Sequence, residues 1–103
     1  MPSMAHAGVY SSVLNYLKAV EKTGSDDTAT VMKQLKSTEI DDGLFKGKIR
    51  ADGKFAHEML LLEVKKPSES TEPWDYYHVR DVIPAADAAM PIAESKCKLV
   101  AQR

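Results

Sequence analysis

The sequence has one cysteine, Cys97, and therefore cannot close a disulfide within itself. No apolar run approaches the ~20 residues that a membrane-spanning helix needs. Acidic and basic side chains nearly balance, giving a formal net charge of -1, so the clustered positive charge that nucleic-acid binding requires is missing. These absences argue against an internally cross-linked scaffold, a membrane-spanning helix and a nucleic-acid partner.

Two further features bear on the compartment. The N-terminal residues Met1–His6 lack the basic and apolar segments of a secretory signal peptide, so the sequence as written is not expected to be addressed for export. For Cys97 we favour a free thiol, and a bond to a cysteine of another segment or of a second copy of the chain is the alternative.

Catalytic and metal-binding motifs are also missing. There is no glycine-rich phosphate loop, no Gly-x-Ser-x-Gly elbow and no Cys/His pair. His57 and His78 could approach each other if two long strands pair, but two imidazoles leave a metal ion short of ligands, so we expect solvent-facing histidines. The pairs Asp26-Asp27 and Asp41-Asp42 fall where a helix start and a turn call for carboxylates. We therefore predict no enzyme, no metal site and no cofactor.

The composition is that of a globular domain. Hydrophobic residues make up 44% and charged residues 28% of the 103 positions. We predict a single partial domain over residues 1–103, divided into a helical hairpin at 3–38, a β-hairpin region at 47–83 and a tail at 84–103. As an isolated piece, this pattern is of the α+β class.

The helical hairpin is predicted from apolar periodicity and end signals. The first helix spans residues 3–23, with Gly24 at its C-terminus. The second begins after the capping residues Ser25, Asp26 and Asp27 and fades near residues 37–38. The first helix has a broad apolar stripe of Val9, Tyr10, Val13, Leu14, Tyr16, Leu17 and Val20, and the expected buried face of the second is Ala29, Val31, Met32 and Leu35.

Strand patterns follow. Asp41-Asp42-Gly43 indicates a turn, and residues 47–50 and 55–65 flank Asp52-Gly53, a dipeptide typical of tight hairpins. The run Met59–Leu62 is apolar on both faces, which suggests a strand covered on each side. A helix is the competing interpretation, because Met and Leu are good helix formers, but the flanking turns favour a strand. A second long strand is predicted at residues 74–83, then one helical turn at 85–90 and an irregular tail at 91–103.

Three aromatic residues begin that second strand: Trp74, Tyr76 and Tyr77. They could stack on a ligand. We favour packing in the core, because aromatic side chains are ordinary strand formers that pack across neighbouring strands.

Four segments together resemble one family. They are Lys65-Lys66-Pro67-Ser68-Glu69-Ser70, Pro73-Trp74-Asp75-Tyr76-Tyr77, Ala7-Gly8-Val9-Tyr10-Ser11-Ser12 and Ala51-Asp52-Gly53-Lys54. With them the chain resembles, over nearly its whole length, the C-terminal part of periplasmic substrate-binding proteins of branched-chain amino acid ABC transporters. Members of that family have two lobes and are several times longer, so the resemblance implies a piece of a receptor.

The resemblance also implies a fold and a function. In the type I periplasmic-binding-protein fold, two α/β lobes joined by three hinge strands close on an amino acid or related small carboxylate, and the loaded receptor docks on a membrane permease. This chain would supply the last helical pair of the first lobe, a hairpin, the final hinge crossing and the tail. Met4, Ala5 and His6 would face the ligand cleft. Some relatives have an aromatic residue at the position of Ala5, which this chain lacks, so the ligand class stays open. The subgroup that the chain resembles most is that for aromatic and other hydrophobic carboxylates, through the lysine-rich junction at Lys65-Lys66, the Trp-Asp-Tyr-Tyr strand and the Glu94-Ser95-Lys96-Cys97 tail.

Physical reasoning adds one expectation. The stripe around Val13–Leu17 and the run Met59–Leu62 would be exposed in the isolated chain, and large exposed apolar patches promote association. We therefore expect a homo-oligomer, formed by exchange of the helical hairpin or a strand. The alternative function is a stand-alone α+β self-association module that binds no ligand.

Overall fold

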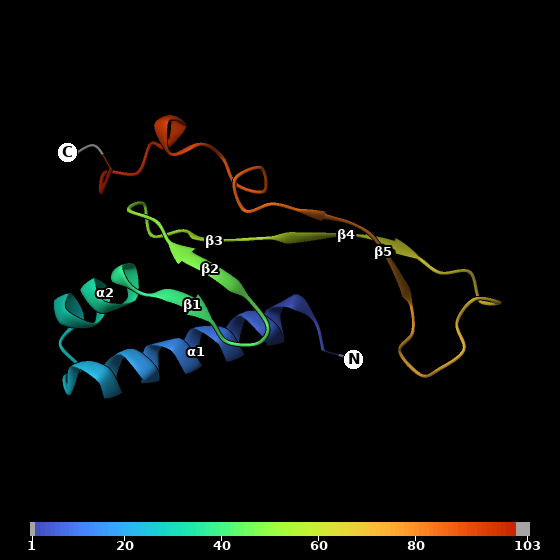
Figure 1. Ribbon diagram of the computed structural model, residues 1–103, viewed down its shortest axis with the longest axis horizontal. Coiled ribbons are helices and arrows are strands. Elements are labelled where there is room, and N and C mark those ends of the chain that lie inside the picture. Colours follow the sequence, from blue (N-terminus) through green and yellow to red (C-terminus); the bar gives the residue numbers. More distant parts are fainter. Residues whose placement is uncertain (1, 101–103) are drawn as a thin grey trace.

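The computed structural model describes residues 2–100, in which two helices precede two separate antiparallel sheets and an irregular tail (Figure 1). Met1 and the last predicted tail residues, 101–103, lie outside the described part. The α+β form of the prediction is the one observed. The elements are α1 Met4–Thr23, α2 Thr28–Ser37, β1 Glu39–Asp41, β2 Lys46–Ile49, β3 Phe55–His57, β4 Met59–Val64, β5 Tyr77–Ile83 and the 3-10 helix η1 Ile92–Glu94.

Both predicted helices are confirmed, and local signals explain their ends. Gly24 has a left-handed φ of 65°, and its N–H donates to the Val20 carbonyl at 2.8 Å, which closes α1. Asp27 caps α2 by accepting a hydrogen bond from the Thr30 N–H at 3.0 Å. No helix within residues 2–100 is both long and apolar enough to cross a bilayer.

The side of α1 that packs within the chain is its small and polar side. Ser11 and Ala19 are buried there, and Ser11 faces Asp42 in the loop after β1, whereas the apolar stripe is open, with Val13 53% and Leu17 56% exposed. The expected exposure of this stripe is thus confirmed. The buried face predicted for α2 is partly wrong, because of its four residues only Val31 is buried, and Ala29 and Met32 face solvent.

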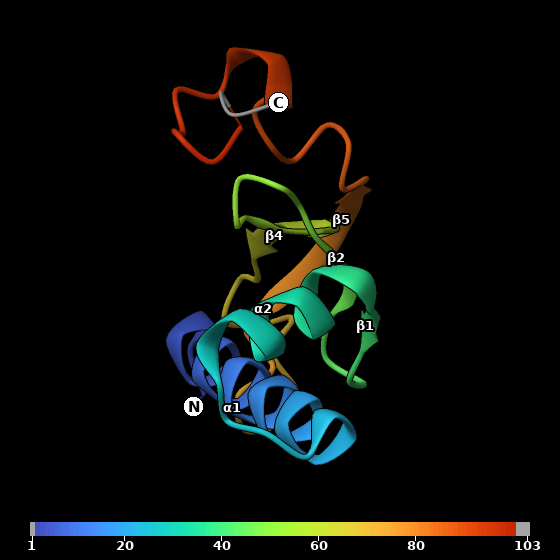
Figure 2. The ribbon, with the colours of Figure 1, turned by 90° about the vertical axis from the view of Figure 1, so that its left-hand side faces the viewer.

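The first sheet has the order β1-β2-β3, and β1 was not predicted. Asp41, expected in a turn, pairs with Lys46 at the end of β1, so the turn begins one residue later. The tight turn between β2 and β3 is confirmed: Gly53 has a φ of 83°, and its N–H donates to the Arg50 carbonyl at 2.9 Å. This sheet lies beside the helix pair (Figure 2).

The long strand predicted at residues 55–65 is divided at Glu58. Its first part, β3, belongs to the first sheet, and its second part, β4, pairs with β5 in a separate two-stranded ribbon. Every β4 residue is exposed, so the expected exposure of Met59–Leu62 in the isolated chain is confirmed, and within residues 2–100 neither face of this strand is covered. The ribbon extends away from the helices (Figure 1) and makes the molecule long, 52 × 33 × 17 Å.

The strand predicted from Trp74 begins instead at Tyr77. Trp74 occupies a tight turn closed by the Asp75 N–H, which donates to the Glu72 carbonyl at 3.2 Å, and its φ of 72° is left-handed. The aromatic residues are also not core residues here: Trp74 is 60% exposed, and Tyr76 and Tyr77 are exposed as well.

The two strand histidines do not approach each other. His57 pairs with Gly47 in the first sheet and His78 pairs with Glu63 in the ribbon, so the hypothesis that they come together is wrong. His78 instead lies 3.6 Å from a carboxylate oxygen of Glu69.

The tail lies along the turn between β2 and β3. Arg50 is paired with Asp52 and also donates to the Met90 carbonyl at 2.9 Å. The Cys97 thiol is free and lies 3.8 Å from the Asp52 carbonyl. As predicted, one turn follows β5, closed by hydrogen bonds from the N–H groups of Asp87 and Ala88 to the Pro84 carbonyl.

The pairing of β2 with β3 depends on Gly47, where an added Cβ would lie 2.0 Å from the Ala56 carbonyl oxygen. We predict that Gly47→Ala separates the two strands and lowers the free energy of unfolding by about 2 kcal/mol or more, because a backbone group cannot yield as a side chain can. Urea unfolding followed by circular dichroism measures the change. The matched control is Gly8→Ala, where nothing lies within 4 Å; it should raise stability by about 0.5 to 1 kcal/mol. Equal effects of the two substitutions would contradict the prediction.

Candidate functional site

A groove of about 610 Å³ opens between the first half of α1 and the first sheet. Its lining is mainly apolar, and none of its described lining residues carries a carboxylate, an ammonium or a guanidinium group. The lining residues are Met4, Ala5, Gly8, Ser11, Ser12 and Asn15 from α1, Leu35 from α2, Ile40, Phe45, Ile49, Gly53, Phe55 and His57 from the first sheet and its turns, and Met59 from β4.

Of the three residues predicted to face a ligand cleft, two line this groove and the third does not. Met4 and Ala5 line it from the start of α1. His6 turns back toward Ser3, whose backbone N–H donates to His6 Nδ1 at 3.0 Å. The His6 ring therefore serves the first turn of the helix, in the way a Glu or Gln does in a capping box.

An aromatic cluster of Phe45, Phe55 and His57 forms the sheet wall of the groove. The centre of the His57 ring lies 4.6 Å from that of Phe45 and 5.1 Å from that of Phe55. Its Nδ1 is 2.7 Å from the Glu58 carbonyl oxygen, which fixes the ring. His57 is thus partly buried among aromatic rings, and the expectation that it faces solvent is wrong. The spacing of Phe55 and His57 by two residues, which places both on one face of a strand, was the available signal.

A cluster of hydrogen bonds centred on Asp42 holds the helix wall of the groove to the sheet. One carboxylate oxygen accepts from the Ser11 hydroxyl and from Asn15 Nδ2, the latter at 2.8 Å. The other oxygen accepts from the backbone N–H groups of Leu44 at 3.0 Å and Phe45 at 2.8 Å. The Asp42 cluster therefore joins two turns of α1 to the loop between β1 and β2.

The same cluster sets the ionisation of Asp42. Burial opposes its charge, but the hydrogen bonds from Ser11, Phe45, Leu44 and Asn15 outweigh burial and lower the pKa of the carboxyl from 3.8 to about 2. Because Ser11 and Asn15 donate to Asp42, their donor groups are satisfied away from the groove. The groove then offers a ligand mainly apolar surface.

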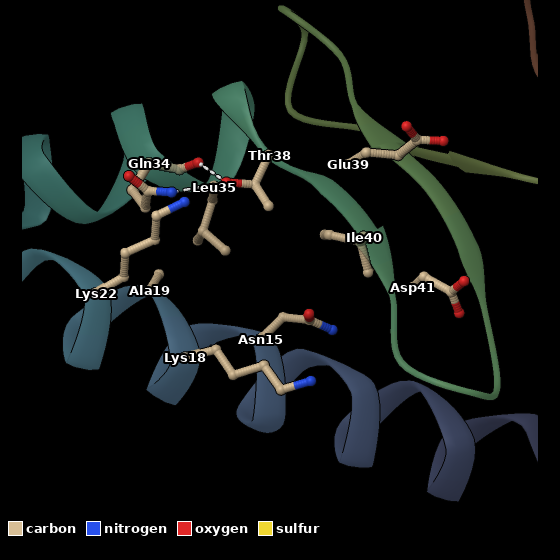
Figure 3. Close-up of a pocket in the computed structure, with 10 residues that line it drawn as sticks. All are labelled: Asn15, Lys18, Ala19, Lys22, Gln34, Leu35, Thr38, Glu39, Ile40 and Asp41. Atoms are coloured by element: carbon tan, nitrogen blue, oxygen red, sulfur yellow. Dashed lines mark hydrogen bonds between the residues drawn. The ribbon is translucent and has the colours of Figure 1, made fainter.

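A smaller pocket of about 250 Å³ lies on the other side of Asn15, Leu35 and Ile40, which line both hollows (Figure 3). Its floor is apolar and its rim carries lysines from α1 and the carboxylates of β1. Along one side, Gln34 Nε2 donates a hydrogen bond to the Thr38 hydroxyl at 2.7 Å. This pocket is small and its charged side chains face solvent, so we interpret it as the gap between packed elements. We assign the larger groove as the candidate site.

The groove is suited to contact with an apolar group. Within residues 2–100, no cluster of three or more histidine, cysteine or acidic residues could hold a metal ion. The only titratable group in the lining is His57. An amino acid bound here would need partners for its ammonium and carboxylate groups from outside these residues.

Comparisons with known proteins agree with one another. A family model described as "Periplasmic binding protein" matches residues 1–70. Among solved structures, a periplasmic binding protein from Burkholderia mallei is 55% identical, with a TM-score of 0.91 over 96% of this chain. A branched chain amino acid ABC transporter periplasmic ligand-binding protein from Burkholderia xenovorans is 39% identical, with a TM-score of 0.92 over 97% of this chain. The matches cover 26% and 27% of those two proteins, so this chain spans about a quarter of their length. No curated protein sequence matches significantly.

The Asp42 cluster predicts acid-sensitive stability. Because the folded-state pKa lies below the unfolded value, its stabilisation is present above pH ~4 and is lost as the pH falls toward ~2. We predict that Asp42→Ala lowers the free energy of unfolding at pH 7 by about 2 kcal/mol, since hydrogen bonds to a charged acceptor are lost. The substitution should also make the free energy of unfolding fall less steeply between pH ~4 and pH ~2, the acid limb of the stability curve. Urea titrations between pH 2 and pH 7 provide the test. Asp41→Ala, which removes an exposed neighbouring carboxylate, is the control. An unchanged acid limb in Asp42→Ala would refute the assignment.

Proposed function

The chain belongs to the periplasmic binding protein family, and we propose that it is the C-terminal part of a solute-binding protein that delivers amino acids or related small carboxylates to an ABC permease. The observation that supports this most is the 39% identity, over nearly the whole chain, to a ligand-binding protein of a branched-chain amino acid transporter. The family consists of binding proteins and is not catalytic. The parent protein would act in the periplasm.

Within that protein, we assign this chain to the wall of the cleft that receives the ligand's side chain. Met4 and Ala5 stand at the start of α1, and His6 fixes the backbone of the same turn. The groove behind them is apolar and lacks a counter-charge for an ammonium or carboxylate group. The ligand's charged groups would then be held by the remaining part of the protein, and its apolar side chain would be directed toward these residues.

A second candidate function is self-association without a ligand. It is favoured by the exposure of the α1 stripe and of all six β4 residues, surfaces that a soluble chain tends to cover. In this case the isolated chain would be a homo-oligomer.

The first proposal is tested with a chimera in which this chain replaces the quarter of the Burkholderia xenovorans protein that it matches. We predict that the chimera binds leucine, isoleucine, valine, phenylalanine or benzoate in calorimetric titrations. The 103-residue chain alone should give no heat, because half a cleft cannot bury a ligand. Ala5→Asp in the chimera should weaken binding about tenfold or more, because it places a charge beside the ligand's apolar side chain.

Aspartate is favoured in the first turn of a helix, so the Ala5→Asp variant should fold normally. Lys33→Ala, an exposed change on α2, is the control and should leave the affinity unchanged. A folded chimera that binds none of these ligands would count against the proposed ligand class. Normal affinity in the Ala5→Asp variant would show that Ala5 does not contact the ligand.

The second candidate is tested on the isolated chain. Sedimentation velocity between ~1 and ~100 µM should show mass increasing with concentration, because apolar surfaces associate by mass action. Val13→Asp, at the centre of the α1 stripe, should reduce association, and Asp26→Asn is the control. A single monomeric species across the whole range would exclude a self-association module.

A further inference from the structure

A hollow of about 490 Å³ lies on the face of the first sheet that is turned away from the groove. Lys48 and Ala56 are register partners and share this face, whereas their neighbours Ile49 and Phe55 form the next register pair and line the groove. We call this hollow the basic pocket. Its lining residues are Lys36 from α2, Lys48 and Ile49 from β2, Arg50 and Ala51 from the turn that follows, Ala56 from β3 and Leu99 from the tail.

The lining of the basic pocket has three cationic side chains and no carboxylate. Lys36 is half-buried, and its ammonium group donates a hydrogen bond to the Ala51 carbonyl at 3.2 Å. Among residues 2–100, neither Lys36 nor Lys48 forms an ion pair, although Glu39 is the register partner of Lys48. Because burial of a cation is costly without a counter-charge, the half-buried Lys36 points to an anion as its partner.

Arg50 is held at the edge of the basic pocket by its own hydrogen bonds. Its Nε donates to Asp52 Oδ1 at 3.1 Å, its Nη2 donates to the other carboxylate oxygen, and its Nη1 donates to the Met90 carbonyl at 2.9 Å. These bonds use three of the five N–H groups of the guanidinium, so two have no acceptor in the described part of the chain. The orientation of these two donors is fixed before any ligand arrives.

Asp52 offsets only part of the positive charge. The hydrogen bond from Arg50 lowers the pKa of the Asp52 carboxyl to about 2, so this group is ionised at neutral pH. It therefore balances one of the three cations that line the basic pocket. An excess of two positive charges remains, on Lys36 and Lys48.

We propose that the basic pocket binds the phosphate group of a small phosphate monoester. Such a group carries a charge of about -1.5 to -2 at pH 7 and has three acceptor oxygens. Lys36 and Lys48 supply the matching charge, and the two remaining N–H groups of Arg50 supply hydrogen bonds in the fork geometry that suits phosphate. The alanine and leucine side chains of the lining would then contact an apolar body of the ligand.

A carboxylate fits the basic pocket less well, because it brings one charge and two oxygens where the pocket offers two charges and several donors. The site is also separate from the groove. None of its three cations lines the groove, and Ile49 is the one residue common to the two linings. Binding of a phosphate group here therefore does not depend on the proposed function.

The test is a titration of the 15N-labelled 103-residue chain with phenyl phosphate at pH ~7.5, where the monoester is mostly a dianion. Sodium chloride holds the ionic strength constant, so that screening does not change during the titration. The expected result is a saturable shift of the amide signals of Lys36, Lys48 and Arg50, with a dissociation constant of about 1 mM or below. Sodium benzoate should bind about tenfold more weakly or not at all. Absence of saturation with phenyl phosphate, or equal affinity for benzoate, would overturn the proposal.

A second arm identifies the source of the phosphate group. The chain is floated with vesicles of phosphatidylcholine that contain phosphatidic acid, and with vesicles of phosphatidylcholine alone. Binding to the acidic vesicles alone assigns the site to a lipid headgroup. Saturable binding of phenyl phosphate without flotation assigns it to a soluble monoester. A chain that binds neither phenyl phosphate nor acidic vesicles has no phosphate site.

Substitutions locate the binding. Lys36→Ala and Lys48→Ala should each weaken it about tenfold, because each removes one charge-assisted contact. Lys36→Ala also loses the hydrogen bond to Ala51, whereas Lys48 is exposed and its substitution should leave the fold unchanged. The matched control is Lys66→Ala, which removes the same charge from an exposed position in the loop after β4. Unchanged affinity in Lys48→Ala, or an equal loss in Lys66→Ala, would contradict the assignment.

Discussion

The position of α1 on the rest of the chain depends on one carboxylate. Asp42 accepts hydrogen bonds from Ser11 and Asn15 on the helix and from two backbone N–H groups of the loop that precedes β2. Apolar burial alone could not fix this arrangement, because the buried residues between positions 2 and 100 are Ser11, Ala19, Val31 and Ile40. A directional cluster, rather than a packed core, therefore sets the angle between helix and sheet and thereby the width of the groove.

Features with local causes could be predicted from the sequence. The helix ends follow from Gly24 and Asp27, and the tight turn follows from Asp52-Gly53, because each needs only residues a few positions away. The break at Glu58 could not be predicted, since the apolar period continues through it and only the choice of a different partner strand ends the pairing.

The candidate site was predictable to a similar degree. The family resemblance directed attention to the start of α1, where Met4 and Ala5 line the groove, and their contact with a ligand stays a prediction. The Asp42 cluster and the aromatic wall were missed because they join residues that are distant in sequence: Ser11 lies 31 positions from Asp42. Aspartate before glycine indicates a turn whatever else its side chain binds, so the tertiary role was hidden by the local one.

The attachment of the tail has a consequence for the order in which the chain folds. Arg50 reaches its acidic partner two positions away and the Met90 carbonyl 40 positions away. Closing the short loop costs far less chain entropy than closing the long one. The turn between β2 and β3 therefore forms before the tail binds to it. During synthesis, this turn can form before Met90 has been translated.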